Sequence, residues 1–146
     1  MGVLIDNRQA THPVALDMYR QKAQAVLDVL DCPEKELSVL LLDDPQIAAL
    51  NQTYLKREGP TNVIAFPMQE GEFTDISPDL LGDVVISLDT AEREGRRAGI
   101  DMQTRAIELM VHGVLHLLGY DHEHDEKEAR RMEAKSVAVL AAIEMV

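Results

Sequence analysis

The chain has 146 residues and a formal net charge of -12 at pH 7, and a chain of this length usually forms one domain that buries roughly 68–70% of its unfolded surface. Apolar residues make up 46% of the chain, but aromatic residues only 3%, and Trp is absent. We therefore expect a core built from aliphatic side chains. The acidic charge argues against broad, non-specific binding to nucleic acid, which depends on Lys and Arg contacts to phosphate. Any RNA contact has to be local.

The cysteine content and the apolar pattern indicate a cytoplasmic protein. Cys32 is the single cysteine, which excludes an intramolecular disulfide and fits a reducing compartment; we expect it to be structural rather than reactive. The first residues lack the basic region and the long apolar run of a signal peptide. No stretch approaches the ~18 apolar residues that span a bilayer.

Two apolar segments in the first third of the chain predict strands on either side of a long helix. Residues 3–5 form a short apolar run, and residues 37–42 form a continuous one, as expected of a strand buried on both faces. Between them, apolar residues recur at helical spacing to about residue 30. We expect this helix to begin with a cap at Thr11 or His12, with a proline in its first turn.

A second helix is predicted directly after the apolar run. Asp44 suits the N-cap and Pro45 the first helical position, and the helix should end near Tyr54. The strand, cap and helix together favour a β-α-β unit.

Two further strands are expected at residues 62–66 and 81–87. Residues 69–79, between them, contain glycine, proline and several acids, which is typical of a surface loop. Asp89 or Thr90 would then cap a short, charged helix.

The last part of the chain predicts two more helices. Asp101 is a good N-cap for a helix over residues 102–118, and Asp125 can begin a helix that runs to the C-terminus. The whole order favours one α+β domain over residues 1–146, with about four strands in a mixed sheet covered by helices.

Three histidines in and after the 102–118 helix form the most informative pattern. His112 and His116 are four residues apart, so both imidazoles lie on one helix face. Gly119 suits the helix C-terminus, because glycine enters the left-handed conformation without a Cβ penalty. The chain can then turn back and bring His122 to the same point. Three neutral imidazoles with an open fourth position make a catalytic-type site for one zinc ion, although nickel or copper also binds imidazole.

The spacing matches that of the metzincin proteases, H-E-x-x-H-x-x-G-x-x-H, at every fixed position except one. Gly113 stands where those enzymes have glutamate, the general base beside the metal-bound water. The pattern therefore predicts a metal centre, on a late helix and the turn after it, that lacks the base of a peptidase.

Other polar residues close to the motif have two interpretations each. Asp121 is a candidate catalytic base, but it also suits the turn after the glycine. His124 fits the start of the last helix better than a fourth ligand position. Glu108 lies one turn before His112, either as an exposed helix residue or as an acceptor that orients an imidazole.

The motif resembles the signature of the YbeY family of bacterial endoribonucleases, the rRNA maturation factors. The resemblance covers roughly residues 37 to 140. The matching segments are His112-Gly-Val-Leu-His116-Leu-Leu-Gly119-Tyr120-Asp121-His122 and, upstream, Leu50-Asn51 with Tyr54, Pro60-Thr61-Asn62-Val63, Phe66-Pro67 and Leu81-Gly82-Asp83.

The resemblance implies a zinc-dependent, single-strand-specific endoribonuclease. Such an enzyme would act in rRNA processing, at the 3′ end of 16S rRNA, and in ribosome quality control. Its partners would be single-stranded RNA and the small ribosomal subunit or ribosome-associated factors. Carried over by position, His112, His116 and His122 would be the metal ligands.

This chain departs from the family pattern at two positions. The family usually has an arginine directly after the aromatic residue of N-x-x-[YF], where this chain has Leu55, and a serine before Phe-Pro, where it has Ala65. The nearest basic residues are Lys56 and Arg57. We take Arg57 as a catalytic candidate, and Lys56, Arg57 and Asn62 as substrate-binding candidates.

Two other functions fit part of the pattern. One is a metal-dependent hydrolase with a different substrate, such as a phosphoesterase or a peptidase, although Gly113 disfavours the peptidase. The other is a ribosome-assembly binding module whose zinc is mainly structural, which the acidic charge and Leu55 both favour. Water and the RNA's own 2′-hydroxyl both stay candidates for the attacking group, and the oligomeric state stays open.

Overall fold

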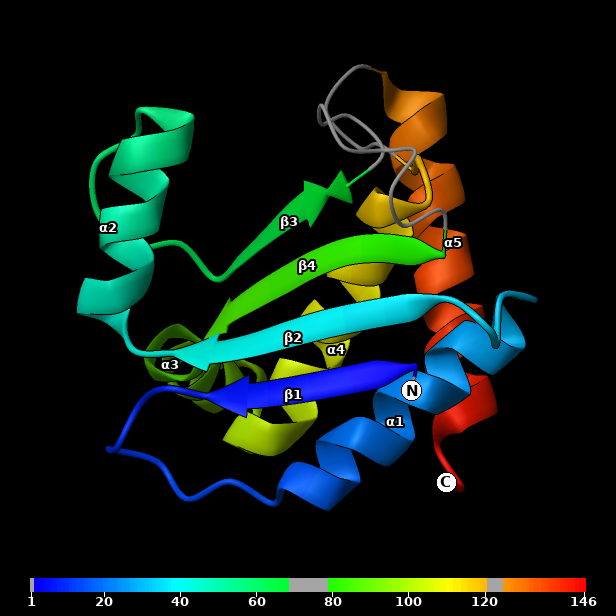
Figure 1. Cartoon of the computed structure of the whole chain (residues 1–146), viewed down its shortest axis with the longest axis horizontal. Coiled ribbons are helices and arrows are strands. Elements are labelled where there is room, and N and C mark those ends of the chain that lie inside the picture. Colours follow the sequence, from blue (N-terminus) through cyan, green and yellow to red (C-terminus); the bar gives the residue numbers. More distant parts are fainter. Residues whose placement is uncertain (1, 69–78, 121–124) are drawn as a thin grey trace.

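Four strands form one mixed sheet with helices on both faces (Figure 1). The computed structural model describes residues 2–68, 79–120 and 125–146, so the expected surface loop lies outside the described residues except at position 79. The elements in chain order are β1 (Val3–Asn7), α1 (Leu16–Val29), β2 (Glu36–Leu42), α2 (Asp44–Leu55), β3 (Val63–Pro67), β4 (Leu80–Ser87), α3 (Leu88–Ala98), α4 (Met102–Leu117) and α5 (Glu126–Ile143).

The strand order β1-β2-β4-β3 confirms the predicted α+β fold and corrects one detail of the connectivity. β1 and β4 both run parallel to β2, and β3 runs antiparallel to β4 at the edge of the sheet. The β-α-β unit is therefore β1-α1-β2; the unit expected from β2, α2 and the next strand was wrong. Local sequence signals cannot show which strand takes the central place. The eight-residue β4 lies between β2 and β3, and the five-residue β3 is left at one edge of the sheet.

Alternate residues of the central strand face two separate apolar layers, as the two-residue period of a strand requires. Val84 and Ile86 join the main core, which α1, α4 and α5 cover, while Val85 and Ile64 pack beneath Ile47 of α2. Figure 1 accordingly shows α2 apart from the other helices. The main core is almost wholly aliphatic, as expected. Within the described part of the chain, no helix is long and apolar enough to cross a membrane.

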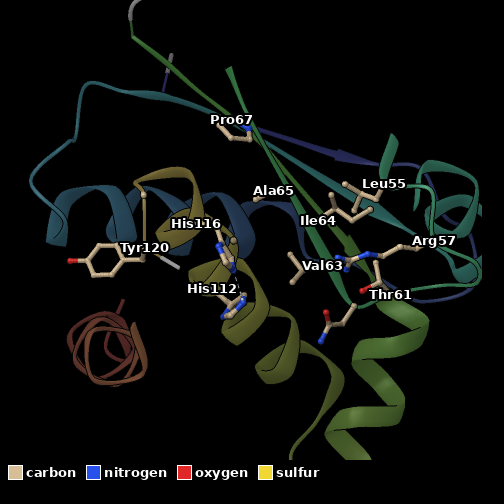
Figure 2. A pocket seen from close by; sticks show the side chains of 13 residues that line it. Leu55, Arg57, Thr61, Val63, Ile64, Ala65, Pro67, His112, His116 and Tyr120 are labelled. Atoms are coloured by element: carbon tan, nitrogen blue, oxygen red, sulfur yellow. Dashed lines mark hydrogen bonds between the residues drawn. The ribbon is translucent and has the colours of Figure 1, made fainter. Parts of the chain in front are cut away.

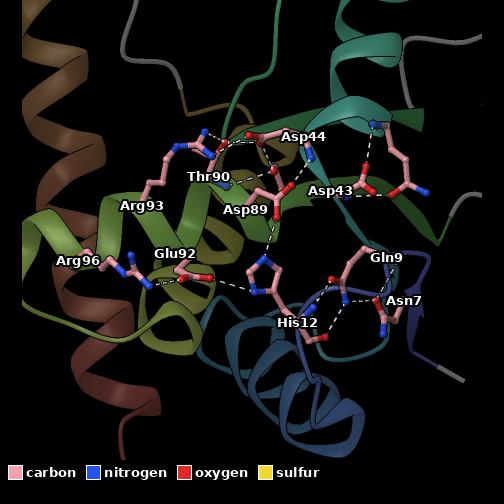
Figure 3. A network of polar contacts seen from close by, with 12 residues as sticks. Asn7, Gln9, His12, Asp43, Asp44, Asp89, Thr90, Glu92, Arg93 and Arg96 are labelled. Atoms are coloured by element: carbon pink, nitrogen blue, oxygen red, sulfur yellow. Dashed lines mark hydrogen bonds and ion pairs between the residues drawn. The ribbon is translucent and has the colours of Figure 1, made fainter.

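The segment before α1 is held by side chains instead of forming the start of the helix. The prediction that α1 begins at Thr11 or His12 was wrong, since it begins at Leu16 after Ala15. His12 is drawn toward α3, with Nε2 2.7 Å from Asp89 Oδ1 and Nδ1 3.1 Å from Glu92 Oε2 (Figure 3). These contacts satisfy both ring nitrogens and hold the residue outside the helix.

The cap of α2 differs from the prediction by one residue. Asp43 is the N-cap, and its carboxylate accepts a hydrogen bond from the Gln46 backbone N–H at 2.9 Å, while the Gln46 side chain accepts one from the Asp43 backbone. This reciprocal capping box satisfies two N–H groups of the helix start. Asp44 is therefore free to bind elsewhere.

Asp44 connects the start of α2 to the start of α3 (Figure 3). Its carboxylate accepts hydrogen bonds from Ser87 Oγ at 2.6 Å and Thr90 Oγ1 at 2.7 Å, and it lies 2.8 Å from Arg93 Nη1. Burial alone would raise the pKa of Asp44, but the hydrogen bonds and the Arg93 charge outweigh it, so the pKa lies below its ordinary value. Ser87, rather than Asp89 or Thr90 as expected, is the N-cap of α3.

The predicted caps of the last two helices are confirmed. Asp101 and Asp125 cap α4 and α5, each accepting a hydrogen bond from the backbone N–H three residues on at 2.7 Å. Cys32 is buried, and burial raises the pKa of its thiol, which fits a structural cysteine.

We predict that Asp44→Asn lowers the free energy of unfolding by about 1.5–3 kcal/mol at pH 7, the usual contribution of a hydrogen bond to a charged group. Because folding lowers the pKa of Asp44, its stabilisation is present above the unfolded pKa of about 3.9 and is lost as pH falls through the folded value. In urea titrations, the difference in free energy of unfolding between the wild type and Asp44→Asn should therefore be large at pH 7 and small at pH 3. Asp17→Asn, on the exposed side of α1, is the control and should change stability little at either pH. An equal effect of Asp44→Asn at both pH values would contradict this account.

Candidate metal centre

A close approach between α4 and the sheet positions the histidine motif. Gly113 lies where a Cβ atom would come within 2.6 Å of Val84 Cγ1 and 3.4 Å of Val63 Cγ2. Because glycine has no Cβ, the α4 backbone packs directly on β4 and β3 at this point. The same crowding shows why a peptidase glutamate does not fit here. The close contact at Gly113 thus explains why the peptidase glutamate is absent and why α4 packs so close to β4 and β3.

The two histidines of α4 point their ring nitrogens at each other. His112 Nε2 and His116 Nε2 are 3.1 Å apart, and their rings meet edge to face with centroids 4.6 Å apart. Two imidazole nitrogens on one tetrahedral zinc, at about 2.0–2.1 Å from the metal, would be separated by about 3.3–3.4 Å. Both side chains are half-buried. The pair therefore fits the metal predicted from the sequence with very little movement.

The end of α4 turns the chain back toward this pair. Gly119 has a φ of 97°, its N–H donates to His116 O at 3.0 Å, and the Tyr120 N–H donates to Leu115 O at 3.0 Å. These two bonds make a Schellman motif, the helix ending that a left-handed glycine favours. Arg131 of α5 lies 5.2 Å from the centre of the Tyr120 ring. The predicted role of Gly119 is confirmed.

The third proposed ligand stays a prediction. His122, the candidate base Asp121 and His124 all lie outside the described residues. Over residues 2–68, 79–120 and 125–146, no group of three metal-binding side chains comes together. The described part of the site therefore contributes two imidazoles and the turn that leads to position 122.

A cavity of about 700 Å³ opens beside the two histidines (Figure 2). This volume lies within the range of small-ligand sites, about 300–1,000 Å³. The end of α2 and the loop after it, β3, and the end of α4 form its walls. The lining residues are Leu55, Arg57, Thr61, Asn62, Val63, Ile64, Ala65, Pro67, His112, Gly113, His116, Gly119 and Tyr120. Leu55 and Ala65, where the chain departs from the family pattern, thus face the cavity beside the metal pair.

Arg57 reaches this cavity from the loop after α2. Figure 2 shows it on one side and the histidines on the other, with Val63 between them in this view. The buried Asn51 holds this loop in place. Its backbone carbonyl accepts a hydrogen bond from the Arg57 backbone N–H at 3.3 Å, and its side-chain amide donates one to the Gly59 carbonyl at 2.9 Å. Among the described residues, the Arg57 guanidinium makes no ion pair.

Lys56, the other basic candidate, is placed differently. It takes a left-handed conformation at the end of α2, with a φ of 57°, and its ammonium donates to Thr53 O at 2.9 Å. It is not one of the residues that line the cavity. Its predicted role in substrate binding has no support from this geometry and stays a prediction.

Asn62 lines the cavity and connects it to an ion network that the sequence did not reveal. Its Nδ2 lies 3.3 Å from each carboxylate oxygen of Glu94. Arg105 Nε donates to Glu94 Oε1 at 3.0 Å, and Arg105 Nη1 donates to Glu108 Oε1 at 2.9 Å. Glu108 thus uses its carboxylate to hold Arg105. Asn62 and Glu94 are 32 residues apart, and no local pattern pairs them.

Comparison with known proteins identifies similar chains over almost the whole length. The family model described as "Endoribonuclease YbeY" matches residues 4–144. A protein of that name from Geobacter sulfurreducens is 49% identical over 99% of this chain and 97% of its own length. One from Syntrophotalea carbinolica is 48% identical over 98% and 97%, and one from Aquifex aeolicus is 46% identical over 82% and 80%.

A solved structure supports the fold independently. The solution structure of TM1509 from Thermotoga maritima aligns with a TM-score of 0.68, covering 97% of this chain and 88% of its own. The two sequences are 23% identical, so this similarity bears on the architecture alone.

We predict that Gly113→Ala lowers the free energy of unfolding by about 1 kcal/mol. The added methyl overpacks against Val84, at a cost of about 1–3 kcal/mol, which exceeds the gain of about 1 kcal/mol in helix propensity. In a Val84→Ala background the methyl has room, so the same substitution should stabilise the protein. Denaturant titration of the two single variants and the double variant measures this coupling. The same effect in both backgrounds would exclude a direct contact.

Proposed function

This chain belongs to the YbeY endoribonuclease family, and from that premise we propose that it is a metal-dependent nuclease that cleaves single-stranded RNA in the cavity beside His112 and His116. The observation that carries the proposal is the meeting of two converging imidazoles and Arg57 in one cavity. A hydrolase acting on a phosphodiester needs both an electrophilic centre and a cation for the phosphate charge.

His112 and His116, with His122 as the proposed third ligand, would hold one zinc ion. When bound, zinc supplies a Lewis acid that lowers the pKa of water to about 7 and polarises a phosphoryl oxygen. The protein's part is to present neutral imidazoles from a rigid helix. The α4 backbone is held against the sheet at Gly113, so the two nitrogens keep their spacing. Asp121 stays the candidate base.

Arg57 would bind the phosphate next to the scissile bond. A guanidinium donates two parallel hydrogen bonds to phosphate oxygens, and this one has no carboxylate partner among the described residues. It stands two residues after Leu55, the position at which the family usually carries arginine. In a chain with a net charge of -12, RNA attraction depends on such local cations rather than on the overall field.

The proposed preference for single strands rests on the form of the cavity. Its volume, about 700 Å³, is that of a small-ligand site. An unpaired nucleotide can leave the strand axis and enter a cavity of this size, whereas bases within a duplex are already stacked and paired. We extend the proposal to cytoplasmic rRNA processing, at the 3′ end of 16S rRNA, and to ribosome quality control with the small subunit as partner.

The proposal predicts that the purified protein cleaves a short single-stranded RNA and leaves its duplex intact. His116→Ala should lose bound zinc and lower the cleavage rate by more than about 100-fold, since even substitutions around metal ligands cost 10–100-fold. His12→Gln, which changes a histidine outside the cavity, is the control and should retain both the bound zinc and the cleavage rate. Preparations free of host ribonucleases are needed. Undiminished cleavage by His116→Ala would contradict the proposal.

A second prediction separates the two neighbouring basic residues. Arg57→Ala should lower kcat/KM on single-stranded RNA by about 10- to 100-fold, the equivalent of about 1.5–3 kcal/mol for a hydrogen bond to a charged group. Lys56→Ala, which removes an equal charge one residue away, should change it by no more than about twofold. Equal losses in the two variants would show that only general charge attraction matters.

A further inference from the structure

The wall of the cavity holds one side-chain amide in a fixed position. Asn62 directly precedes β3, and its backbone carbonyl accepts a hydrogen bond from the Ser87 N–H at 3.0 Å, where β4 ends. The residue is half-buried and lines the cavity beside Thr61 and Val63. Its backbone is therefore anchored to the central strand.

The neighbouring carboxylate determines which end of the amide faces the cavity. Glu94 lies 3.3 Å from Asn62 Nδ2 through both of its oxygens. An ionised carboxylate accepts hydrogen bonds and donates none, so the NH2 end of the amide has to face it. The carbonyl oxygen Oδ1 is then directed away from Glu94. Among the described residues, no group donates a hydrogen bond to Oδ1. This oxygen is not fully buried either, so a ligand can reach it.

Arg105 holds Glu94 in this orientation. Its Nε and Nη2 each lie 3.0 Å from Glu94 Oε1, and its Nη1 binds Glu108. The side chains of Arg105 and Glu94 are each 28% exposed, and that of Glu108 is 34% exposed. Burial alone would lower the pKa of Arg105, but the hydrogen bonds and charges of the two glutamates raise it overall. Arg105 therefore stays charged and holds Glu94 beside the Asn62 amide.

We propose that Asn62 Oδ1 accepts a hydrogen bond from a ribose 2′-hydroxyl of the bound strand, with Glu94 as its positioning residue. An oriented acceptor selects a hydrogen-bond donor. In the sugar-phosphate backbone of RNA, the 2′-hydroxyl is the group that can donate, and it is the group that distinguishes RNA from DNA. Asn62 shares the cavity with Arg57, so a phosphate bound by Arg57 brings the adjacent ribose close to this wall. The inference rests on the proposed function.

The test measures affinity for a single-stranded RNA and for the DNA of the same sequence. Fluorescence anisotropy is recorded on ice with the metal-loaded full chain, and a gel checks that the RNA is intact. The wild type should prefer RNA by about tenfold, the value of one hydrogen bond that the DNA cannot make. Asn62→Ala should lose that preference through weaker RNA binding, with DNA affinity unchanged.

Variants of Glu94 test its positioning role. Glu94→Ala leaves the amide unoriented and should reduce the RNA preference as Asn62→Ala does. Glu94→Gln keeps an acceptor for the Asn62 NH2 and should restore more than half of the preference. Glu92→Gln, on the same helix but outside the network, should leave both affinities as they are. Thermal unfolding shows whether each variant is folded; if Asn62→Ala is not, the two Glu94 variants carry the test.

The outcomes separate this inference from the proposed function. A wild type that cleaves RNA, together with an Asn62→Ala variant that keeps the RNA preference, would overturn the inference and leave the nuclease standing. Equal losses for RNA and DNA in Asn62→Ala would overturn it in favour of a base or phosphate contact. A wild type that binds both strands equally would overturn it whether or not RNA is cleaved.

Discussion

The contact between Gly113 and Val84 is the constraint on which the site depends. A helix normally stands off a sheet by the length of its side chains, but here a Cβ atom on residue 113 would lie 2.6 Å from Val84 Cγ1. That close approach sets His112 and His116, the residues on either side of Gly113 in the motif, beside β3 and the cavity. The pairing of their nitrogens follows from helix geometry, but their place in the fold follows from the missing side chain between them.

The charges of the chain are arranged so that few cations face this cavity. Arg93, Arg96 and Arg105 each bind a carboxylate of the same region, within or next to α3. Arg57 makes no such pair in the described part of the chain, and it lines the cavity. Paired arginines contribute to the fold, whereas an unpaired one can bind an anionic ligand. A strongly acidic protein can in this way bind a polyanion at one point without attracting it everywhere.

The sequence predicted those features of the site that depend on a single helix and its end. The four-residue spacing of His112 and His116 and the left-handed Gly119 could be read from the sequence, because each depends on one helix and its end. The role of Asp44 could not be read from the sequence, since its carboxylate binds Ser87 at the end of β4 and Thr90 in α3, more than 40 positions away, and leaves the cap to Asp43. The antiparallel direction of β3 and the contact of Asn62 with Glu94 could not be predicted for the same reason. Both depend on which distant segments pack together.

The central claim is that one metal ion, bound at the α4 histidines, is responsible for RNA cleavage. The most direct test is to remove the metal with a chelator, dialyse, and return zinc in measured steps while recording the initial rate of single-stranded RNA cleavage and the thermal stability. The account predicts no cleavage in the metal-free protein and a rate that rises linearly until one zinc is bound per chain. Full cleavage by metal-free protein would contradict it. So would a protein that regains its stability with zinc but never cleaves RNA, because the metal would then be structural.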